Sequence, residues 1–351
     1  MSEVWLVNLL ILFTGASLLL YVVLGGADYG AGILELLPSG EYRERQKKLI
    51  NVAMGPVWEA NHMWLIILVV ILFMGFPLAF QVLMTSLHLP VVALLVGIVV
   101  RGAVFTFRHY DAVKDDRSQR IYTALFCFSS LWTSIWLGVI AASLFRGQMV
   151  IDSRDFHEAY VAPWWGLFPF TMGLFVSATF AYLASLYLVG ESTDKELMRF
   201  FSRRAFIFNC LVVVLGAAVF FTSWLDGVGL VEDFVASPLS LACLAGATTL
   251  FLALWLASSR HHVYLARILA AGQVTLILLG WYFVHAPRIF VAKGAEITFY
   301  QAAAPKATLL QLAIALLVGS IFIFPSLFYL LKVFKSHPGA EDLEPQSEEQ
   351  L

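Results

Sequence analysis

Apolar residues run along this chain in long stretches, which short polar segments separate. An apolar stretch of about 20 residues is long enough to cross the roughly 30 Å of hydrocarbon in a bilayer as a helix. Stretches of this kind fall at residues 5–36, 50–76, 78–107, 119–145, 165–189, 204–224, 238–258, 262–285 and 307–334. The pattern predicts an all-α, polytopic integral membrane protein with about nine transmembrane helices. Their order allows two four-helix bundles and one further helix, and the second and third stretches, on either side of Pro77, are the least clearly separated.

Composition supports a membrane protein and leaves little room for a soluble domain. Hydrophobic residues make up 60% of the 351 positions and charged residues 13%, whereas soluble domains average about 45–50% and about 25%. We therefore expect residues 1–335 to form one transmembrane helical domain. Residues 336–351 contain five acidic residues and two prolines but few apolar residues, a composition typical of a disordered acidic tail.

The distribution of Lys and Arg predicts the orientation in the membrane. Of the 22, fifteen lie in the connections after the first, third, fifth and seventh stretches or at the end of the ninth, and five lie in the alternate connections. Loops rich in Lys and Arg remain in the cytoplasm. The N-terminus is therefore predicted outside, and the C-terminus with its acidic tail is predicted in the cytoplasm.

Asp28 is a carboxylate inside the first apolar stretch. Its neighbours Gly25, Ala31 and Gly32 share its helix face by i, i+3, i+4 and i+7 spacing. Asp28 thus lies in a groove of small residues that another helix can approach closely. Acidic residues in membrane helices usually face a protein interior or a wet cavity and mark proton, ion or substrate pathways. We interpret the glycines as helix contacts and Asp28 as a candidate for a proton or ion pathway.

A second polar group opens the next apolar stretch, where the chain reads Trp-Glu-Ala-Asn-His-Met-Trp. Glu59 and His62, three residues apart, face the same way. Asn61 is turned elsewhere, and Trp58 and Trp64 flank the pair. A buried carboxylic acid beside a histidine can relay a proton, because both groups can then titrate near neutral pH. A polar clamp to another helix is the alternative, and the pattern leaves both open.

Arg101 is the basic residue placed deepest in the third stretch. Counting about 1.5 Å per residue from the cytoplasmic ends puts Arg101 about 10 Å deep, and Asp28 and Glu59 roughly 13 Å deep. A buried guanidinium needs a carboxylate partner, so the sequence predicts an ion pair of Arg101 with Asp28 or Glu59. Asp28, Glu59, His62 and Arg101 together form a candidate proton pathway or buried polar cluster. A water-filled channel could connect this cluster to the cytoplasm. His88, near the outer end of the same stretch, is interpreted as a packed or interfacial histidine.

Four segments of the chain together resemble one known family. Gly-Gly-Ala-Asp-Tyr-Gly at 25–30 is similar to its Asp-Gly-x-Asp-x-Gly, and the segment 58–64 is similar to its Trp-Asp/Glu-Gly/Ala-Asn-x-x-Trp. Arg-Gly-Ala-Val-Phe-Thr-Phe-Arg at 101–108 is similar to its Arg-Gly-x-x-Phe-Glu-Phe-Arg, and 300–309 is similar to a segment that ends in Thr-Leu. This family is subunit II of the cytochrome bd type quinol oxidases, including the cyanide-insensitive branch. The second segment is the most specific, and the order of all four argues against coincidence.

The resemblance implies a heterodimer in the bacterial plasma (inner) membrane. Its subunit I would hold two hemes b and one heme d, oxidise quinol near the outer surface and reduce dioxygen to water. Protons for water come from the cytoplasm and quinol protons leave outside, so a proton gradient forms. Subunit II, which this chain resembles, ordinarily supplies no catalytic residue, heme ligand or metal ligand. It is expected to brace subunit I and to carry part of a cytoplasmic proton path. The resemblance also allows a structural quinone and a small accessory subunit, and it implies no nucleic-acid partner.

Three positions depart from the family pattern, and each departure removes a carboxylate. Gly25 replaces the earlier acid of the first motif, Thr106 replaces a common Glu, and Gln301 stands where an Asp is frequent. If the family route for protons uses the earlier acid, Asp28 and Glu59 must carry it here, or the route lies wholly in subunit I.

Three other functions compete with this one. A secondary proton- or ion-coupled transporter would also place carboxylates within the bilayer, although such folds favour interrupted helices that face a substrate. The spacing of Glu59 and His62 occurs in carboxylate di-iron bundles, but those need two such motifs and two further Glu. A heme protein in its own right could use His62 or His88, and the absorbance spectrum of the isolated subunit would separate this case.

Overall fold

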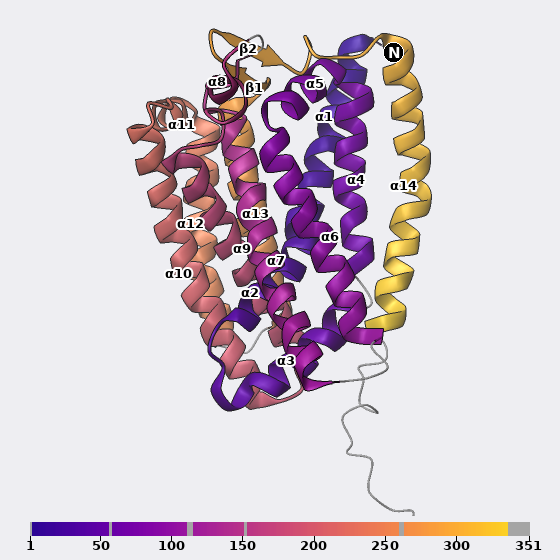
Figure 1. Cartoon of the computed structure of the whole chain (residues 1–351), viewed down its shortest axis with the longest axis vertical. Coiled ribbons are helices and arrows are strands. Elements are labelled where there is room, and N and C mark those ends of the chain that lie inside the picture. Colours follow the sequence, from indigo (N-terminus) through magenta and orange to yellow (C-terminus); the bar gives the residue numbers. More distant parts are fainter. Residues whose placement is uncertain (1, 56–57, 111–114, 151–152, 260–262, 336–351) are drawn as a thin grey trace, which may run out of the picture.

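The computed structural model describes residues 2–55, 58–110, 115–150, 153–259 and 263–335, which form a bundle of long helices (Figure 1). Among these residues, nine helical segments are long and apolar enough to cross a membrane, and the all-α polytopic fold is confirmed. The predicted acidic tail, 336–351, lies outside the described residues. The spans are α1 to α2 taken together (Glu3–Leu36), α4 (Trp58–Gly75), α6 (His88–Tyr110), α7 (Asp116–Ser143), α9 (Leu167–Glu191), α10 (Lys195–Leu225), α12 (Pro238–Ser259), α13 (Val263–His285) and α14 (Lys306–Lys335).

The first span changes its helical geometry near the middle. It consists of α1 (Glu3–Leu20), the π-helix η1 (Tyr21–Gly25) and α2 (Gly26–Leu36). A π-helical turn widens the helix locally, and such turns are frequent at functional sites. Here the π-helical turn ends three residues before Asp28. The side chains of α2, including Asp28, are therefore rotated about the helix axis relative to their positions in one regular α-helix.

The stretch predicted at 50–76 is divided in the structure. A short 3-10 turn, η2 (Gly40–Tyr42), leads into α3 (Arg43–Met54), and the span itself is α4. α3 begins in the basic segment and lies at the end of the bundle opposite the N-terminus (Figure 1). Glu59 therefore stands in the first turn of α4 and not several turns inside a span, which corrects the depth expected from the sequence.

The prediction that the third span begins at residue 78 was wrong. Pro77 favours the first turn of a helix and starts α5 (Pro77–Ser86), whose 10 residues cover only about 15 Å and cannot cross the bilayer. Leu87 then leaves helical geometry, with φ −111° and ψ 20°. The third span is α6 alone.

A small cap covers the end of the bundle that holds the N-terminus (Figure 1). Its short helices are α8 (Phe156–Tyr160) and α11 (Leu230–Ala236), and its strands are β1 (Arg288–Ala292) and β2 (Ala295–Thr298). The strands form an antiparallel hairpin that turns at Gly294, where φ is +81°. Hydrogen bonds of 2.7 Å from Val291 N to Leu144 O and from Lys293 N to Met149 O attach the hairpin to the chain after α7.

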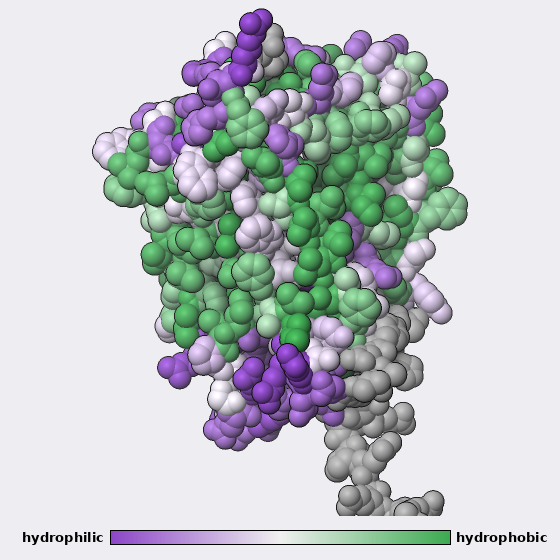
Figure 2. Space-filling view, in the orientation of Figure 1, coloured by the Kyte–Doolittle hydropathy of each residue, from purple (hydrophilic) through white to green (hydrophobic). Residues whose placement is uncertain are grey.

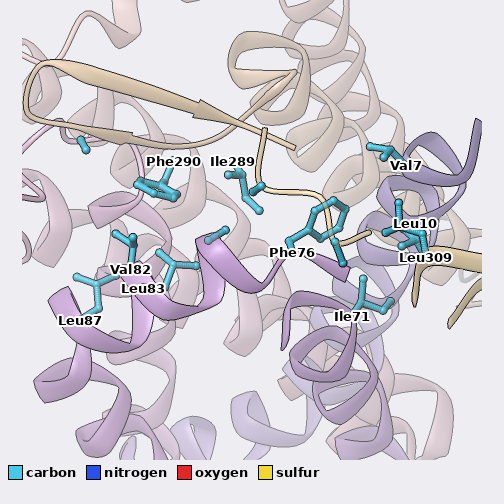
Figure 3. Packing of buried hydrophobic residues seen from close by; sticks show 14 of the residues in the cluster. Val7, Leu10, Ile71, Phe76, Val82, Leu83, Leu87, Ile289, Phe290 and Leu309 are labelled. Atoms are coloured by element: carbon cyan, nitrogen blue, oxygen red, sulfur yellow. The ribbon is translucent and has the colours of Figure 1, made fainter. Parts of the chain in front are cut away.

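Apolar side chains fill the space under this cap (Figure 3). Ile289 and Phe290 of β1 belong to the same buried cluster as Val82 and Leu83 of α5 and Phe76 just before it. The apolar residues of α5 thus close the end of the core under the cap, which explains why this segment is apolar without crossing the membrane.

α9 is the central helix, because it packs against α2, α7, α10 and α13. In the 18-residue apolar segment of α9, 78% of the residues are buried. In the corresponding segment of every other described span, at most 44% are buried. Small residues allow membrane helices to approach closely. A side chain at Gly30 of α2 would overlap the backbone of Phe180, and one at Gly138 of α7 would lie 2.6 Å from the backbone of Gly173. α9 therefore holds α2 and α7 at short range.

On the face that Figure 2 shows, the middle of the bundle is mostly apolar and both ends are mostly polar. This distribution is the one expected for a protein whose sides face hydrocarbon and whose ends face water.

Candidate functional site

The structure places Arg101 of α6 against Asp28 of α2. Arg101 Nη2 lies 2.6 Å from Asp28 Oδ1 and also donates a hydrogen bond of 3.1 Å to the backbone oxygen of Asp28. Arg101 Nε donates to Ser130 Oγ of α7 at 3.2 Å. Both charged residues are fully buried. The sequence predicts that Arg101 pairs with either Asp28 or Glu59, and in the structure its partner is Asp28.

Aromatic rings surround the guanidinium of Arg101. Its central carbon lies 4.7 Å from the ring centre of Tyr29 and 5.2 Å from that of Phe126. A cation over an aromatic face is attracted by the electron density of the ring, more strongly when water is excluded. The charge of Arg101 is therefore balanced by one carboxylate, one carbonyl and two rings.

A second buried ion pair lies seven residues further along both helices, and the sequence analysis missed it. Arg108 donates two hydrogen bonds of 2.9 Å to the two carboxylate oxygens of Glu35. The side chain of Arg108 is only 1% exposed and that of Glu35 only 4%. The fifteen basic residues counted in the connections of the first set included Arg108, just after the third stretch, and this assignment was wrong because Arg108 lies buried in α6.

The sequence did contain a signal for this second pair. Asp28 and Glu35 are seven residues apart in one helix, and Arg101 and Arg108 are seven apart in another. Two helices that run side by side in the same direction bring residues with equal spacing to the same levels. The guanidinium of Arg108 lies 5.3 Å from the ring of Phe126, which also contacts Arg101, so this one ring adjoins both pairs.

The glycines of the first span pack in two different directions. A Cβ atom at Gly32 would overlap the hydroxyl of Ser130 on α7. A Cβ atom at Gly25 would lie 3.1 Å from the ring of Tyr21 in its own span and 3.8 Å from Cβ of Asn61 on α4. Both positions serve close packing, as the sequence predicts, but they do not line one common groove.

His62 faces the interior of the bundle, among aromatic rings. Its ring centre lies 5.8 Å from that of Tyr29, 6.4 Å from that of Tyr21 and 6.2 Å from that of Trp58. The hydroxyls of Tyr21 and Tyr29 are 3.1 Å apart. Tyr29 therefore stands between His62 and Arg101, and it connects two of the residues expected from the sequence.

Glu59 is exposed on the surface of the chain. Within the described part of the chain it forms no hydrogen bond and no ion pair. A carboxylate in the first turn also interacts favourably with the N-terminal end of the helix dipole. The structure thus brings Asp28, Arg101 and His62 together in the interior and leaves Glu59 at the edge of α4.

The remaining residues of this motif pack between helices. Trp58 lies 5.6 Å from Phe105 of α6, measured between ring centres. Asn61 is buried, and so is Trp64, whose ring centre is 5.9 Å from that of Phe324 on α14. These side chains anchor α4 to its neighbours.

Several buried polar atoms of the site have no hydrogen-bond partner among the described residues. They are Asp28 Oδ2, Arg101 Nη1, Arg108 Nε, His62 Nδ1 and Thr133 Oγ1. Buried polar groups in proteins are nearly always hydrogen-bonded, and ordered water supplies the bond where protein does not. The site around Asp28 and Arg101 therefore keeps hydrogen-bonding capacity that no described residue uses.

The two histidines singled out by the sequence, His62 and His88, both pack against neighbouring residues. Aromatic rings pack around His62, while Nδ1 of His88 lies 2.9 Å from the backbone oxygen of Thr85 and its ring lies 4.8 Å from that of Tyr160. His88 is thus a packed residue at the N-terminal end of α6. In the described ranges, no three His, Cys, Asp or Glu side chains converge as they would around a metal ion.

Comparison with known proteins points to one family. The sequence profile described as "Cytochrome bd terminal oxidase subunit II" matches residues 6–334. A Bacillus subtilis (strain 168) protein named "Cytochrome bd ubiquinol oxidase subunit 2" is 25% identical over 177 residues, which are 50% of this chain and 49% of that relative. A second protein of that strain, assigned as a cytochrome bd menaquinol oxidase subunit II, is 22% identical over 343 residues, 90% of this chain and 91% of that protein.

The fold is similar to that of a chain in a solved structure, "The structure of bd oxidase from Geobacillus thermodenitrificans". The TM-score is 0.70 with 16% sequence identity, and the match covers 93% of this chain and 98% of the other. At this identity, the likeness concerns the fold alone.

Proposed function

The chain belongs to the family of cytochrome bd terminal oxidase subunit II, and we propose that it is the second subunit of an oxidase that transfers electrons from quinol to dioxygen, forms water and builds a proton gradient. In this proposal a subunit I holds the two hemes b and the heme d, which supply the electron transfer and the oxygen chemistry. This chain contributes no catalytic residue. Its roles are to brace subunit I and to carry protons from the cytoplasm.

The observation that carries the proton role is the buried pair of Asp28 and Arg101 with its unpartnered atoms. Arg101 keeps the carboxylate of Asp28 in place, while Asp28 Oδ2 remains able to accept a hydrogen bond from water. Tyr29 and Tyr21, whose hydroxyls are 3.1 Å apart, lie between this pair and His62. Water and these hydroxyls would pass protons from the level of Asp28 to His62.

Glu59 marks the face that we assign to subunit I. An exposed carboxylate is costly where it borders lipid, and Thr106 and Phe107 of α6 are exposed in the same way. Trp58, the neighbour of Glu59, packs against Phe105 of α6, so the two exposed groups lie at one level. A hydrogen-bond donor or a basic group of subunit I would satisfy Glu59, which could then deliver protons to the partner.

The second pair, Glu35 and Arg108, is assigned a structural role. Two hydrogen bonds hold the carboxylate of Glu35 in one orientation, and a bidentate pair of this kind is strong and specific in geometry. It pins α2 to α6 beside the proposed path without being a step in it.

The proposed location is the bacterial plasma membrane, with the N-terminus outside and the C-terminus inside. The positive-inside distribution supports this orientation. It places the hairpin cap outside and α3 on the cytoplasmic side.

Purification of the chain from its native membrane tests this function. We expect a heme-bearing partner of similar size to co-purify, the visible spectrum of hemes b and d, and oxygen consumption on addition of quinol. Recovery of a stable single chain without hemes or partner would exclude an oxidase subunit.

A further inference from the structure

Three basic residues stand in a row at the start of α10. Lys195, Arg199 and Arg203 follow one another at intervals of four residues, and all three are exposed. Residues four apart lie on the same side of a helix. The row therefore forms one strip of positive charge at the end of the bundle that carries α3.

The carboxylates nearest in sequence are already occupied. Arg45 of α3 forms ion pairs with Asp194 and with Glu196, the latter at 3.3 Å. Arg204, the next residue after the row, turns inward and donates to the backbone oxygens of Leu34 and Pro38. Lys195, Arg199 and Arg203 form no ion pair with any residue that the structure describes. Their charge is thus available to a ligand.

The same side of α10 becomes apolar within one turn. Ile207 is 52% exposed, and Val214 further along is 63% exposed. Phe206 lies beside them, with its ring centre 4.1 Å from that of the half-exposed Trp255 on α12. Tryptophan is enriched where the headgroups of a membrane meet the acyl chains. The boundary between the polar and apolar parts of a lipid layer therefore falls between Arg203 and Ile207.

We propose that this face of α10 binds an anionic phospholipid. Arg199 and Arg203 donate hydrogen bonds to the phosphate, Lys195 adds positive charge at the headgroup, and Phe206, Ile207 and Trp255 contact the acyl chains. Arginine is suited to this role because its planar guanidinium can donate two parallel hydrogen bonds to a phosphate. Clusters of basic residues next to a membrane helix attract anionic lipids. In the proposed orientation, the lipid belongs to the cytoplasmic leaflet.

The experiment uses the assembled complex, stripped of lipid in detergent and returned to nanodiscs of phosphatidylcholine with a minor fraction of phosphatidylglycerol. Native mass spectrometry counts the phosphatidylglycerol that stays bound. Variant Arg199→Gln/Arg203→Gln should lose roughly tenfold to thirtyfold in affinity, since each basic residue contributes a factor of about three to five. Arg199→Lys/Arg203→Lys keeps the charge and should retain most of the binding.

The control is Arg117→Gln/Arg120→Gln, which removes two exposed cations from α7 at the same end of the bundle. It should leave the bound lipid unchanged. If both glutamine variants lose the same amount of bound phosphatidylglycerol, only the total charge matters and the proposed site is wrong. The proposal also fails if Arg199→Gln/Arg203→Gln loses none. Displacement of the lipid by millimolar inorganic phosphate would show a site for free phosphate instead. Melting temperature and heme content show whether each variant is still an assembled oxidase. A variant that is assembled and carries hemes but binds no lipid would contradict only the lipid site and not the proposed oxidase function.

Discussion

Arg101 binds Asp28 through two different groups, the carboxylate at 2.6 Å and the backbone oxygen at 3.1 Å. The second contact depends on the path of the main chain and not on the side chain of Asp28. Arg101 is therefore fixed against α2 by the fold as well as by charge, and the two residues can be altered separately to test what the pair does.

The first prediction concerns the stability of this pair. Arg101→Gln leaves Asp28 buried without its partner and should reduce the free energy of unfolding of the complex by about 3–5 kcal/mol. Asp28→Asn/Arg101→Gln removes both charges and should recover most of that loss. Melting temperature and heme yield of the purified complex measure the effect. If the double variant is no more stable than Arg101→Gln, the charge pairing is not what matters.

Glu59→Gln should slow turnover without disturbing assembly. The substitution keeps size and hydrogen bonding but removes the titratable proton, so oxygen consumption per heme d with excess quinol should fall, and Glu59→Asp should restore part of it. A structural role would instead lower heme content and complex yield in proportion to activity. Unchanged turnover in an intact Glu59→Gln complex would remove Glu59 from the proton path.

Glu35→Gln is expected to have the opposite effect. It replaces one of the two acceptor oxygens with an NH2 group, so one hydrogen bond is lost, and it leaves Arg108 buried without a counter-charge, which should destabilise the complex by a few kcal/mol. Because Glu35 is assigned a structural role, turnover per heme d in the surviving complex should match that of the parent. A fall in turnover with normal melting temperature would place Glu35 in the proton path.

Gly32→Ala tests the close approach of α2 and α7. The added methyl group would overlap Ser130, and overpacking of this kind costs about 1–3 kcal/mol. The matched control is Gly15→Ala, because nothing lies within 4 Å of a Cβ atom there. We expect a lower melting temperature only for Gly32→Ala. Equal melting temperatures for the two variants would show that the helices can separate at no cost.

Cysteine labelling of intact cells tests the orientation. Glu44→Cys in α3 and Arg154→Cys before α8 both introduce exposed thiols at opposite ends of the bundle. A membrane-impermeant maleimide should label Cys at position 154 and reach position 44 only after the cells are opened. Labelling in the reverse order would invert the topology.

The sequence by itself determined the membrane class, nine of the helices and the motifs that carry the family resemblance. These features are local, because the length of an apolar stretch suffices to predict a span and a motif is read along a few consecutive residues. The same local reading located Asp28, Arg101 and His62 as polar residues that need partners, and it limited the partner of Arg101 to two carboxylates.

Only the tertiary structure decided which residues meet. Glu35 and Arg108 are 73 positions apart, and their pairing depends on how far α2 and α6 slide and rotate against each other. Glu59 and His62 share one side of α4, yet Glu59 is exposed while His62 is only partly exposed and packs against aromatic rings, because the edge of the bundle runs between them. The apolar residues of α5 gave the same hydropathy signal as a span, but the hairpin packs on them and closes the core. Burial, contact and register depend on the surfaces that distant segments present to one another, and hydropathy along the chain carries no information about that geometry.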